Sequence, residues 1–205
     1  MNADLEAALR RSAPPGNPDG SASAARQASD RAAAEGLVDL AYTVVPSPLG
    51  NLVLVASPRG LVTVAYEDGR LDALLDRLAA RATPRLLDLP ARLDGVRREL
   101  EEYFDGSRRT FDLVLDWALV RGFTRRVLEA TARIPYGGAS TYLDVAAAAG
   151  SPRAVRAAGN ALGANPMPIV VPCHRVLRTG GGLGGYTGGL ERKRRLLELE
   201  SGSEA

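Results

Sequence analysis

The sequence predicts an α+β fold, in which a small N-terminal antiparallel sheet with helices precedes a C-terminal winged-helix (helix-turn-helix) domain that carries the active site. Three observations support this prediction: alternating apolar runs separated by turns, two later runs with helical spacing, and a pair of short helices joined by one glycine. At 205 residues, the chain has room for one large or two small domains.

The first 37 residues are expected to form a disordered extension, with at most a short helix near Leu5–Leu9. Residues 12–36 are rich in Pro, Gly, Ser, Ala and Asp and offer almost nothing to bury. The predicted boundaries are an extension over 1–37, a structural N-terminal domain over 38–118, a C-terminal domain over 119–200 and a tail over 201–205.

The N-terminal domain is expected to begin with a three-stranded antiparallel meander, because apolar runs alternate there with Pro- and Gly-containing turns. The predicted strands are AYTVV (41–45), LVLVA (52–56) and LVTVAY (61–66). Helical periodicity follows over 70–82 and 93–104, and FDLVLD (111–116) is expected to add one more strand. This domain has no cysteine, no phosphate-binding glycine loop and no set of metal ligands, so a structural role is expected.

The C-terminal domain is expected to start with a helix over 123–134. Ser140 or Thr141 then caps a helix that runs through Ala149, and Gly150 ends it. Ser151 and Pro152 are the preferred pair at the N-cap and first position of a further helix. Two short helices joined in this way predict a helix-turn-helix.

The second of these helices is expected to have a polar face and an otherwise thin surface. Its polar face carries Arg153, Arg156 and Asn160, and the small residues are Ala154, Ala157 and Ala161. Such a helix could lie deep in a groove with Arg156 as its long probe, although an Ala-rich helix that only packs is the alternative.

The chain has one cysteine and one histidine, and they are neighbours, Cys173 and His174. A single cysteine excludes an intrachain disulfide, and the pair is too small for a Cys/His zinc site. Residues 169–171 are expected to form a short buried strand between prolines, which holds Cys173 below the glycine-rich loop 180–189. The charge of Arg175 would favour the thiolate, whereas an inert packing cysteine is the alternative.

The imidazole needs both a route to the thiol and an orienting acceptor. Because consecutive side chains of an extended segment point to opposite faces, we expect a water molecule to bridge His174 and Cys173. A carboxylate in the last helix can orient the imidazole. Glu200 is the candidate, and Glu198 is the less favoured choice.

Charge is unevenly divided along the chain. Residues 1–120 hold 14 basic and 18 acidic residues, whereas residues 121–205 hold 12 basic and 6 acidic residues. A polyanionic partner would therefore meet the C-terminal half, although a solvated basic surface explains the same numbers. Because the chain has no apolar run long enough for a membrane span and no signal-peptide pattern, we expect a reduced, cytoplasmic protein without membrane contact.

The segment Pro172-Cys-His-Arg-Val176 lies between Asn165-Pro-Met-Pro and Gly185-Tyr-Thr-Gly-Gly-Leu190. This pattern resembles the O6-alkylguanine-DNA alkyltransferases, the methylated-DNA–protein-cysteine methyltransferases. The resemblance implies DNA repair by irreversible, stoichiometric transfer of an alkyl group from O6-alkylguanine, or O4-alkylthymine, to Cys173 after the base is flipped out. It also implies double-stranded DNA as partner, a monomer, and no metal or cofactor.

The resemblance also implies roles for individual residues. In the reaction, Cys173 accepts the alkyl group, His174 is the water-linked base, Glu200 is the partner of that histidine, and Tyr142 helps rotate the nucleotide and protonates N3 of the leaving guanine. For the substrate, Asn165 braces the turn before the cysteine, the Val176 carbonyl meets the guanine amino group, and Tyr186 and Thr187 close over the flipped base. For the minor groove of DNA, Arg156 fills the gap in the duplex, and the other contacts are Ser151, Arg153, Ala154, Ala157 and Asn160.

Two other functions remain open at this point. A winged-helix DNA-binding regulator, or a sensor of alkylation, would use Cys173 for packing or sensing without repair. A Cys–His hydrolase is a weaker alternative, because the only histidine adjoins the only cysteine, which is poor geometry for a catalytic dyad.

Overall fold

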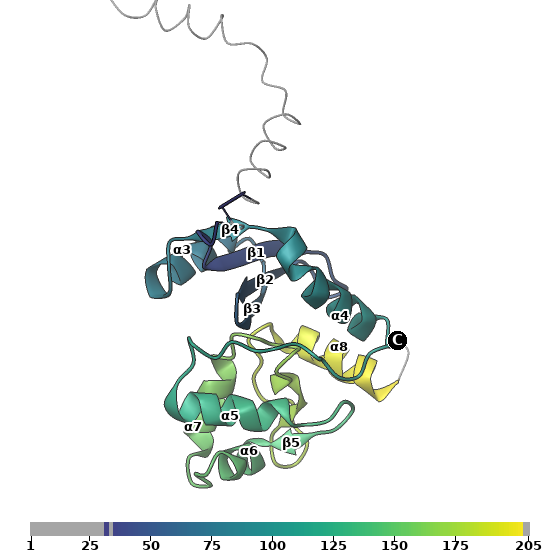
Figure 1. Ribbon diagram of the computed structural model, residues 1–205. Helices are drawn as coiled ribbons and strands as arrows, with labels where there is room; N and C mark the ends of the chain where they lie inside the picture. Colours follow the sequence, from purple (N-terminus) through teal and green to yellow (C-terminus); the bar gives the residue numbers. More distant parts are fainter. Residues whose placement is uncertain (1–30, 33–34, 203–205) are drawn as a thin grey trace, which may run out of the picture. The chain divides into compact units, whose positions relative to one another are not determined.

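The computed structural model describes residues 31–32 and 35–202 (Figure 1). The chain divides into a unit over residues 1–38 and a unit over residues 39–205, and the elements below belong to the second unit. Most of the predicted extension, its short helix near Leu5–Leu9 and most of the predicted tail lie outside the described residues. Arg31 and Ala32, within the segment expected to be disordered, are helical, and the Glu35 N–H donates to the Arg31 carbonyl at 3.0 Å.

The N-terminal part contains the predicted meander, with one additional strand. Strand order is β3-β2-β1-β4, with β1 antiparallel to β2 and β2 antiparallel to β3. The strands are β1 (Leu40–Val45), β2 (Leu52–Ser57), β3 (Gly60–Tyr66) and β4 (Leu86–Asp88). Strand β4, which pairs parallel with β1, was not predicted from the sequence, because three residues are too few to show a period.

The strand expected over residues 111–116 is wrong. Only one bridge forms, between Leu61 and Leu115, and Val114 is 71% exposed. The segment touches the start of β3 where Gly60 adopts a φ of +138°, and a Cβ at Gly60 would overlap the Val114 carbonyl. The glycine therefore permits one close crossing rather than a ladder.

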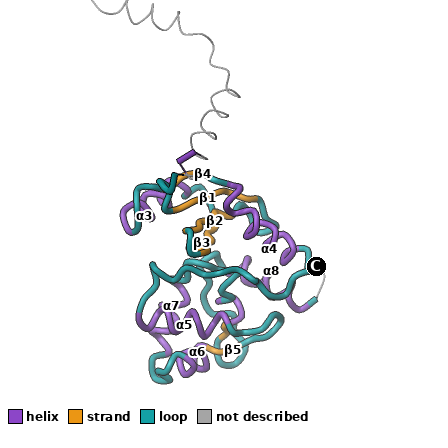
Figure 2. Tube along the Cα trace, viewed as in Figure 1, coloured by secondary structure: helices purple, strands orange, loops and turns teal. Residues whose placement is uncertain are grey.

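Two helices cover this sheet, α3 (Leu71–Arg81) and α4 (Asp94–Phe104), the second preceded by the 3-10 helix η1 (Pro90–Leu93) (Figure 2). Both helices match their predicted ranges within two residues. Leu74 and Leu78, one turn apart on α3, are buried against the sheet. The core that they complete is made by Leu40, Val53, Val55, Val62, Leu74 and Leu78.

The C-terminal part is a cluster of helices with a two-stranded parallel sheet. Its helices are α5 (Gly122–Ala132), α6 (Tyr142–Ala148), α7 (Val155–Gly163) and α8 (Leu190–Ser201), and its strands are β5 (Ser140–Thr141) and β6 (Val176–Leu177). Thr141 is the N-cap of α6 and forms a capping box with Asp144. Helices α5, α6 and α7 pack on one another, and α6 and α7 form the predicted helix-turn-helix.

The predicted start of the second of these helices is wrong, because α7 begins at Val155 rather than after Ser151. The Ala154 N–H donates to the Ser151 carbonyl at 2.9 Å, which closes a turn before the helix. Arg153 therefore precedes α7 and is not on its polar face. Ala161 is 3% exposed, so it belongs to the packed side of α7 rather than to the thin surface.

The strand predicted over residues 169–171 is also wrong. The segment is a buried turn in which the Val171 N–H donates to the Met167 carbonyl at 2.8 Å, and Ile169 has a φ of +76°. Prolines at 166, 168 and 172 remove three of the N–H groups that a ladder would need. Cys173 consequently starts a short 3-10 helix, η2 (Cys173–Arg175), instead of ending a strand.

Candidate active site

Cys173 is almost fully buried and is held by a side-chain amide. It is 5% exposed, and its Sγ accepts a hydrogen bond from Asn165 Nδ2 at 3.1 Å. The same Nδ2 donates to the Val171 carbonyl at 2.8 Å, and the Asn165 Oδ1 accepts from the Met167 N–H at 3.0 Å. The side chain of Asn165, just after α7, thus forms hydrogen bonds both with the turn over residues 167–171 and with the Cys173 thiol.

A buried ammonium, Lys193 of α8, is the cation that acts on this thiol. Its Nζ donates to the Val176 carbonyl at 2.6 Å, to the Gly185 carbonyl at 3.4 Å and to the Leu183 carbonyl. Burial raises the pKa of Cys173, and the Asn165 hydrogen bond and the charge of Lys193 oppose that rise. Burial also lowers the pKa of Lys193 to about 8.

Arg175, which the sequence analysis expected to favour the thiolate, is directed elsewhere. Its Nε and Nη2 donate to the two oxygens of Glu200 at 2.9 and 2.8 Å, and its Nη1 donates to the Ile134 carbonyl. That expectation is corrected, because sequence adjacency does not set the direction of a long side chain in a 3-10 turn.

Glu200 is buried in α8 and accepts hydrogen bonds from several parts of the chain. Besides Arg175, its donors are His174 Nε2 at 2.8 Å, Tyr103 Oη at 2.7 Å and the Gly137 N–H at 3.2 Å. Burial by itself would raise the pKa of Glu200, but hydrogen bonds from His174 and Arg175 lower it to about 2. The carboxylate is therefore charged at neutral pH.

His174 is fully buried, and burial lowers its pKa, with the charges of Arg175 and Lys193 acting in the same direction and Glu200 opposing them. A neutral ring whose Nε2–H donates to Glu200 leaves Nδ1 without a proton. This Nδ1 is buried and has no hydrogen-bond partner among the described residues. A neutral imidazole oriented by a carboxylate, with its other nitrogen free, can act as a general base.

A water molecule is expected to bridge His174 and Cys173 on the basis of an extended backbone at residues 173–174, but the structure gives a different reason for their separation. No direct hydrogen bond joins the imidazole and the thiol in the described part of the chain. The two residues lie in a 3-10 helix, so the alternation of extended side chains does not explain their separation. Successive positions of a 3-10 helix are about 120° apart around the axis, which also directs the two groups differently.

Tyr186 connects the glycine-rich loop to His174 and to the N-terminal sheet. Its ring lies edge-on to the imidazole, with 6.4 Å between centroids. Its hydroxyl shares a 2.9 Å hydrogen bond with the hydroxyl of Tyr66 in β3, over which the guanidinium of Arg192 stacks. The next residue, Thr187, donates from Oγ1 to the Gly163 carbonyl at 2.9 Å.

Tyr142 lies at the first position of α6 and meets the same loop. Its hydroxyl accepts from the Gly185 N–H at 3.1 Å. A Cβ at Gly184 would overlap the Tyr142 hydroxyl, and one at Gly188 would overlap the Tyr66 ring and come within 2.8 Å of the Tyr186 ring. These close approaches explain why the loop needs glycine at both positions.

The residues predicted to meet DNA lie in and before α7. Arg156, Ala157 and Asn160 are exposed on the helix, Arg153 is exposed in the preceding turn, and Ser151 and Ala154 are half-buried. Val176 lies apart from them, fully buried, with its carbonyl bound to Lys193.

Three residues at the site were missed from the sequence: Lys193, Tyr103 and Tyr66. Lys193 is the only lysine beside 25 arginines, which is the one signal the sequence offered for it. Tyr103 and Tyr66 were assigned to the core or to a strand of a structural domain, and no local pattern links them to residues about 100 positions later.

Within the described ranges, no three His, Cys, Asp or Glu side chains gather as a metal site would require. In that same part of the chain, no helix combines the length and the apolar character needed to cross a bilayer.

Comparison with known proteins supplies an independent view of this arrangement. Residues 122–202 match the family model described as 6-O-methylguanine DNA methyltransferase, DNA binding domain, and residues 40–117 match its ribonuclease-like domain. A methylated-DNA–protein-cysteine methyltransferase of Mycolicibacterium paratuberculosis is 43% identical over 150 residues, which is 71% of this chain and 89% of the relative. An inducible protein of the same description from Bacillus subtilis is 37% identical over 73% of this chain and 84% of its own.

Solved structures agree with the sequence relatives. The crystal structure of Mycobacterium tuberculosis OGT in complex with DNA superposes with a TM-score of 0.68 at 37% identity, covering 79% of this chain and 93% of that one. The O6-methylguanine-DNA methyltransferase of Pyrococcus kodakaraensis gives a TM-score of 0.55 at 26% identity, covering 78% and 98%.

Proposed function

We propose that this chain, which belongs to the 6-O-methylguanine DNA methyltransferase family, repairs DNA by moving the alkyl group of O6-alkylguanine onto Cys173 in one irreversible step. The observation that carries the assignment to these residues is the buried set formed by the Cys173 thiol, the neutral His174 and the charged Glu200. The acceptor is part of the protein and is consumed, so each molecule acts once.

The transfer begins with removal of a proton from a thiol whose pKa burial has raised. The lone pair of His174 Nδ1 takes that proton through a water molecule, and the charge of Glu200 stabilises the imidazolium that forms. Lys193 and the Asn165 amide stabilise the resulting thiolate. The base is therefore needed because the free thiol is not poised to ionise unaided.

The thiolate then displaces the guanine from the alkyl carbon. The new bond joins Sγ to that carbon, the bond from the carbon to O6 breaks, and its electron pair enters the guanine ring. We propose that the Tyr142 hydroxyl donates a proton to N3, which leaves neutral guanine in the DNA and a thioether at Cys173. The proposed transfer, as written, uses no metal ion and no organic cofactor.

The O6 position lies inside the stacked duplex, so the base must leave the helix before a buried thiol can meet it. We propose that α7 enters the minor groove, where small Ala154 and Ala157 allow a close approach and Arg156 fills the gap. Ser151, Arg153 and Asn160 would contact the flanking backbone.

Four further residues are proposed to hold the flipped base. Asn165 keeps the turn before Cys173 in place, and Tyr186 and Thr187 form the closing loop. The Val176 carbonyl would accept from the guanine amino group with the lone pair that Lys193 leaves free.

A winged-helix regulator or alkylation sensor is not favoured. Such a protein could use α6 and α7 in the same way, but it would have no use for a buried imidazole with a free nitrogen and a charged carboxylate partner. A cytoplasmic monomer, and O4-alkylthymine as an additional substrate, stay predictions.

The test is intact-mass analysis after incubation with a duplex that carries O6-methylguanine. We expect an increment of one methyl group that maps to Cys173, together with restored guanine in the DNA. Cys173→Ser should bind the lesion duplex but gain no mass. Binding by the wild-type chain without a mass change would show that the protein senses the lesion and does not repair it.

A further inference from the structure

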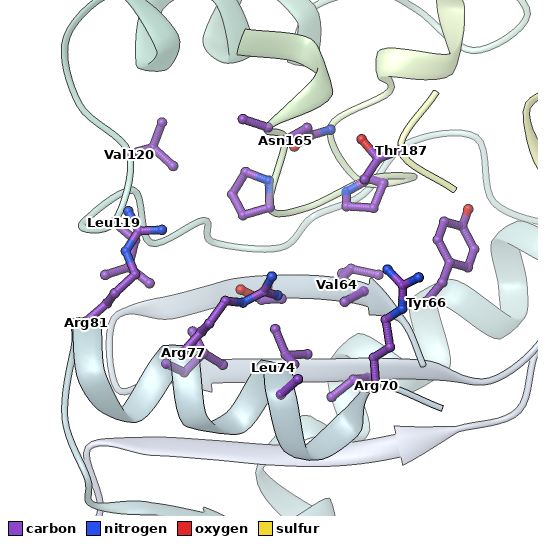
Figure 3. Close-up of a pocket in the computed structure, with 18 of the residues that line it drawn as sticks. Val64, Tyr66, Arg70, Leu74, Arg77, Arg81, Leu119, Val120, Asn165 and Thr187 are labelled. Carbon is purple, nitrogen blue, oxygen red and sulfur yellow. The ribbon is translucent and has the colours of Figure 1, made fainter. Parts of the chain in front are cut away.

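A cavity of about 620 Å³ lies beside the candidate active site and is not used by the transfer reaction (Figure 3). One wall is formed by β3 and α3 of the N-terminal sheet. The other is formed by residues 119–121, Thr124, residues 163–166 and Pro168. Thr187, on the loop over the active site, also lines it.

The wall formed by α3 is one continuous helical stripe. Its lining residues recur at spacings of three and four, as Arg70, Ala73, Leu74, Arg77, Leu78 and Arg81. Leu74 and Leu78 are buried in the core of the sheet. The arginines beside them extend past that core, and Figure 3 shows Arg70 and Arg77 reaching from the helix into the space below Asn165 and Thr187.

Four arginines line this cavity, and we call it the arginine groove: Arg70, Arg77, Arg81 and Arg121. All four are exposed, and none forms an ion pair or a guanidinium hydrogen bond with another described residue. Elsewhere in the described part of the chain, nine arginines do pair with carboxylates: Arg59, Arg85, Arg97, Arg98, Arg108, Arg125, Arg175, Arg192 and Arg195.

The groove also contains two carboxylates, and the one that interacts with the charge of Arg70 is bound mainly by an arginine outside the groove. Asp68 is bound by both terminal nitrogens of Arg192, at 2.8 and 2.6 Å. Glu67 is the other. The groove is therefore strongly positive, and no guanidinium group in it forms an ion pair with a carboxylate of the described residues, which favours the binding of an anion.

We propose that the arginine groove binds the phosphodiester backbone of DNA outside the segment that α7 contacts. The proposal rests on the proposed function, because it extends the same DNA surface. The groove reaches Gly163 and Ala164, where α7 ends, so it is continuous with the helix that is proposed to enter the minor groove.

The dimensions favour a chain of phosphates over a single small anion. Arg70 and Arg81 are eleven residues apart, which is about 16 Å along a helix axis. One DNA strand presents a phosphate about every 3.4 Å of duplex axis. The planar guanidinium matches a phosphate with two parallel hydrogen bonds, and because all four arginines are exposed, a polymer can run along the groove.

The test measures binding to an undamaged 30-base-pair duplex at a series of salt concentrations. The variant carries Arg70→Gln, Arg77→Gln and Arg81→Gln. Each phosphate contact contributes about 0.9 to the slope of log K against log salt concentration, so losing three contacts should reduce the slope by about 2.7. The matched control removes the same charge elsewhere, through Arg85→Gln, Arg97→Gln and Arg98→Gln, and should keep the wild-type slope.

Thermal unfolding establishes that both triple variants are folded before binding is compared. An unchanged slope in the groove variant, or an equal loss in the control, would overturn the proposal. A second outcome would also overturn it: tripolyphosphate stabilises the wild-type chain but not the groove variant, while the two chains have the same salt slope for DNA. The groove would then bind a small anion and not DNA. Undamaged DNA needs no alkyl transfer, so this outcome is independent of the methyl-transfer test.

Discussion

At the scale of single residues, Glu200 is the buried carboxylate that binds both His174 and Arg175. Its carboxylate holds His174 in one orientation and neutralises the buried guanidinium of Arg175. Removing one partner of a buried ion pair destabilises a protein far more than removing one partner of an exposed pair, because the remaining buried charge has no water to solvate it. The same residue therefore supports both the stability and the chemistry of the site.

Glu200→Gln should show both effects. We expect the single-turnover transfer rate to fall by about 100-fold, the lower end of a general-base contribution. The free energy of unfolding should fall by about 3–5 kcal/mol, because Arg175 loses its countercharge. Glu198→Gln, two positions earlier in α8, is the control and should leave both measurements near wild type. Equal behaviour of the two variants would remove Glu200 from the proposed mechanism.

His174 gives the chain a pH dependence that can be assigned without ambiguity, because it is the only histidine. Burial lowers its pKa in the folded state, whereas the unfolded chain takes up a proton near pH 6.5. The contribution of His174 to the free energy of unfolding is therefore fully present above pH 6.5 and is lost as the pH drops toward its folded-state pKa. The expected slope reaches about 1.4 kcal/mol per pH unit.

Urea unfolding between pH 7.5 and 5 measures this slope, and His174→Gln should lack it. NMR of the single imidazole in the wild-type chain measures the folded-state pKa directly, whether or not the variant folds. An imidazole that titrates above pH 6.5 would contradict the neutral base on which the proposed proton transfer depends.

At the scale of elements, the glycine-rich loop is defined by what packs on it. Gly188 lies against Tyr66 and Tyr186, whereas a Cβ at Gly185 would meet nothing within 4 Å. Neither glycine has a positive φ, so the two positions differ in surrounding space and not in backbone strain.

Gly188→Ala should therefore displace the loop and its two tyrosines. Overpacking of this kind costs about 1–3 kcal/mol, and we expect the transfer rate to fall at least tenfold because Tyr186 moves away from His174. Gly185→Ala should keep both stability and rate, since its N–H can still donate to Tyr142. Thermal unfolding and single-turnover kinetics on both variants decide the matter, and two tolerated substitutions would mean that the loop is not held in this position.

Helical elements were predicted well because their signals are local and periodic. Helices α3 and α4 followed from leucine spacing, and the N-cap of α6 followed from Thr141. The wrong predictions lie in segments where proline or glycine determines the backbone conformation, which the spacing of apolar residues does not predict. Residues 169–171 are as apolar as a buried strand, yet the prolines around them force a turn.

The candidate site was predictable to a different degree. Cys173, His174 and Glu200 were found because a lone thiol and a lone imidazole restrict the choice of chemistry. Lys193 was not, since a lysine in a charged helix usually lies in solvent. Tyr66 and Tyr103 reach the site only through long-range packing, which the local pattern of a sequence does not reveal.

At the scale of the whole molecule, the two matched family regions are joined at the active site itself. Tyr66 forms a hydrogen bond with Tyr186, Tyr103 donates one to Glu200, and Asp68 forms an ion pair with Arg192. The sheet domain, expected to be structural, thus supplies hydrogen bonds to Glu200, which binds His174, and to Tyr186 of the glycine-rich loop. Each of these contacts comes from residues after position 38.

Two shortened chains test this dependence. A chain that starts at residue 38 should transfer a methyl group from an O6-methylguanine duplex at the full-length rate, because all the site contacts described above lie between residues 66 and 200. A chain that starts at residue 119 loses Tyr66, Asp68 and Tyr103, which leaves Arg192 without its carboxylate and Glu200 with one donor fewer. Its rate should fall by at least tenfold. A large loss on removing residues 1–37 would show that the extension takes part in repair, and full activity from residue 119 onward would show that the sheet domain does not support the site.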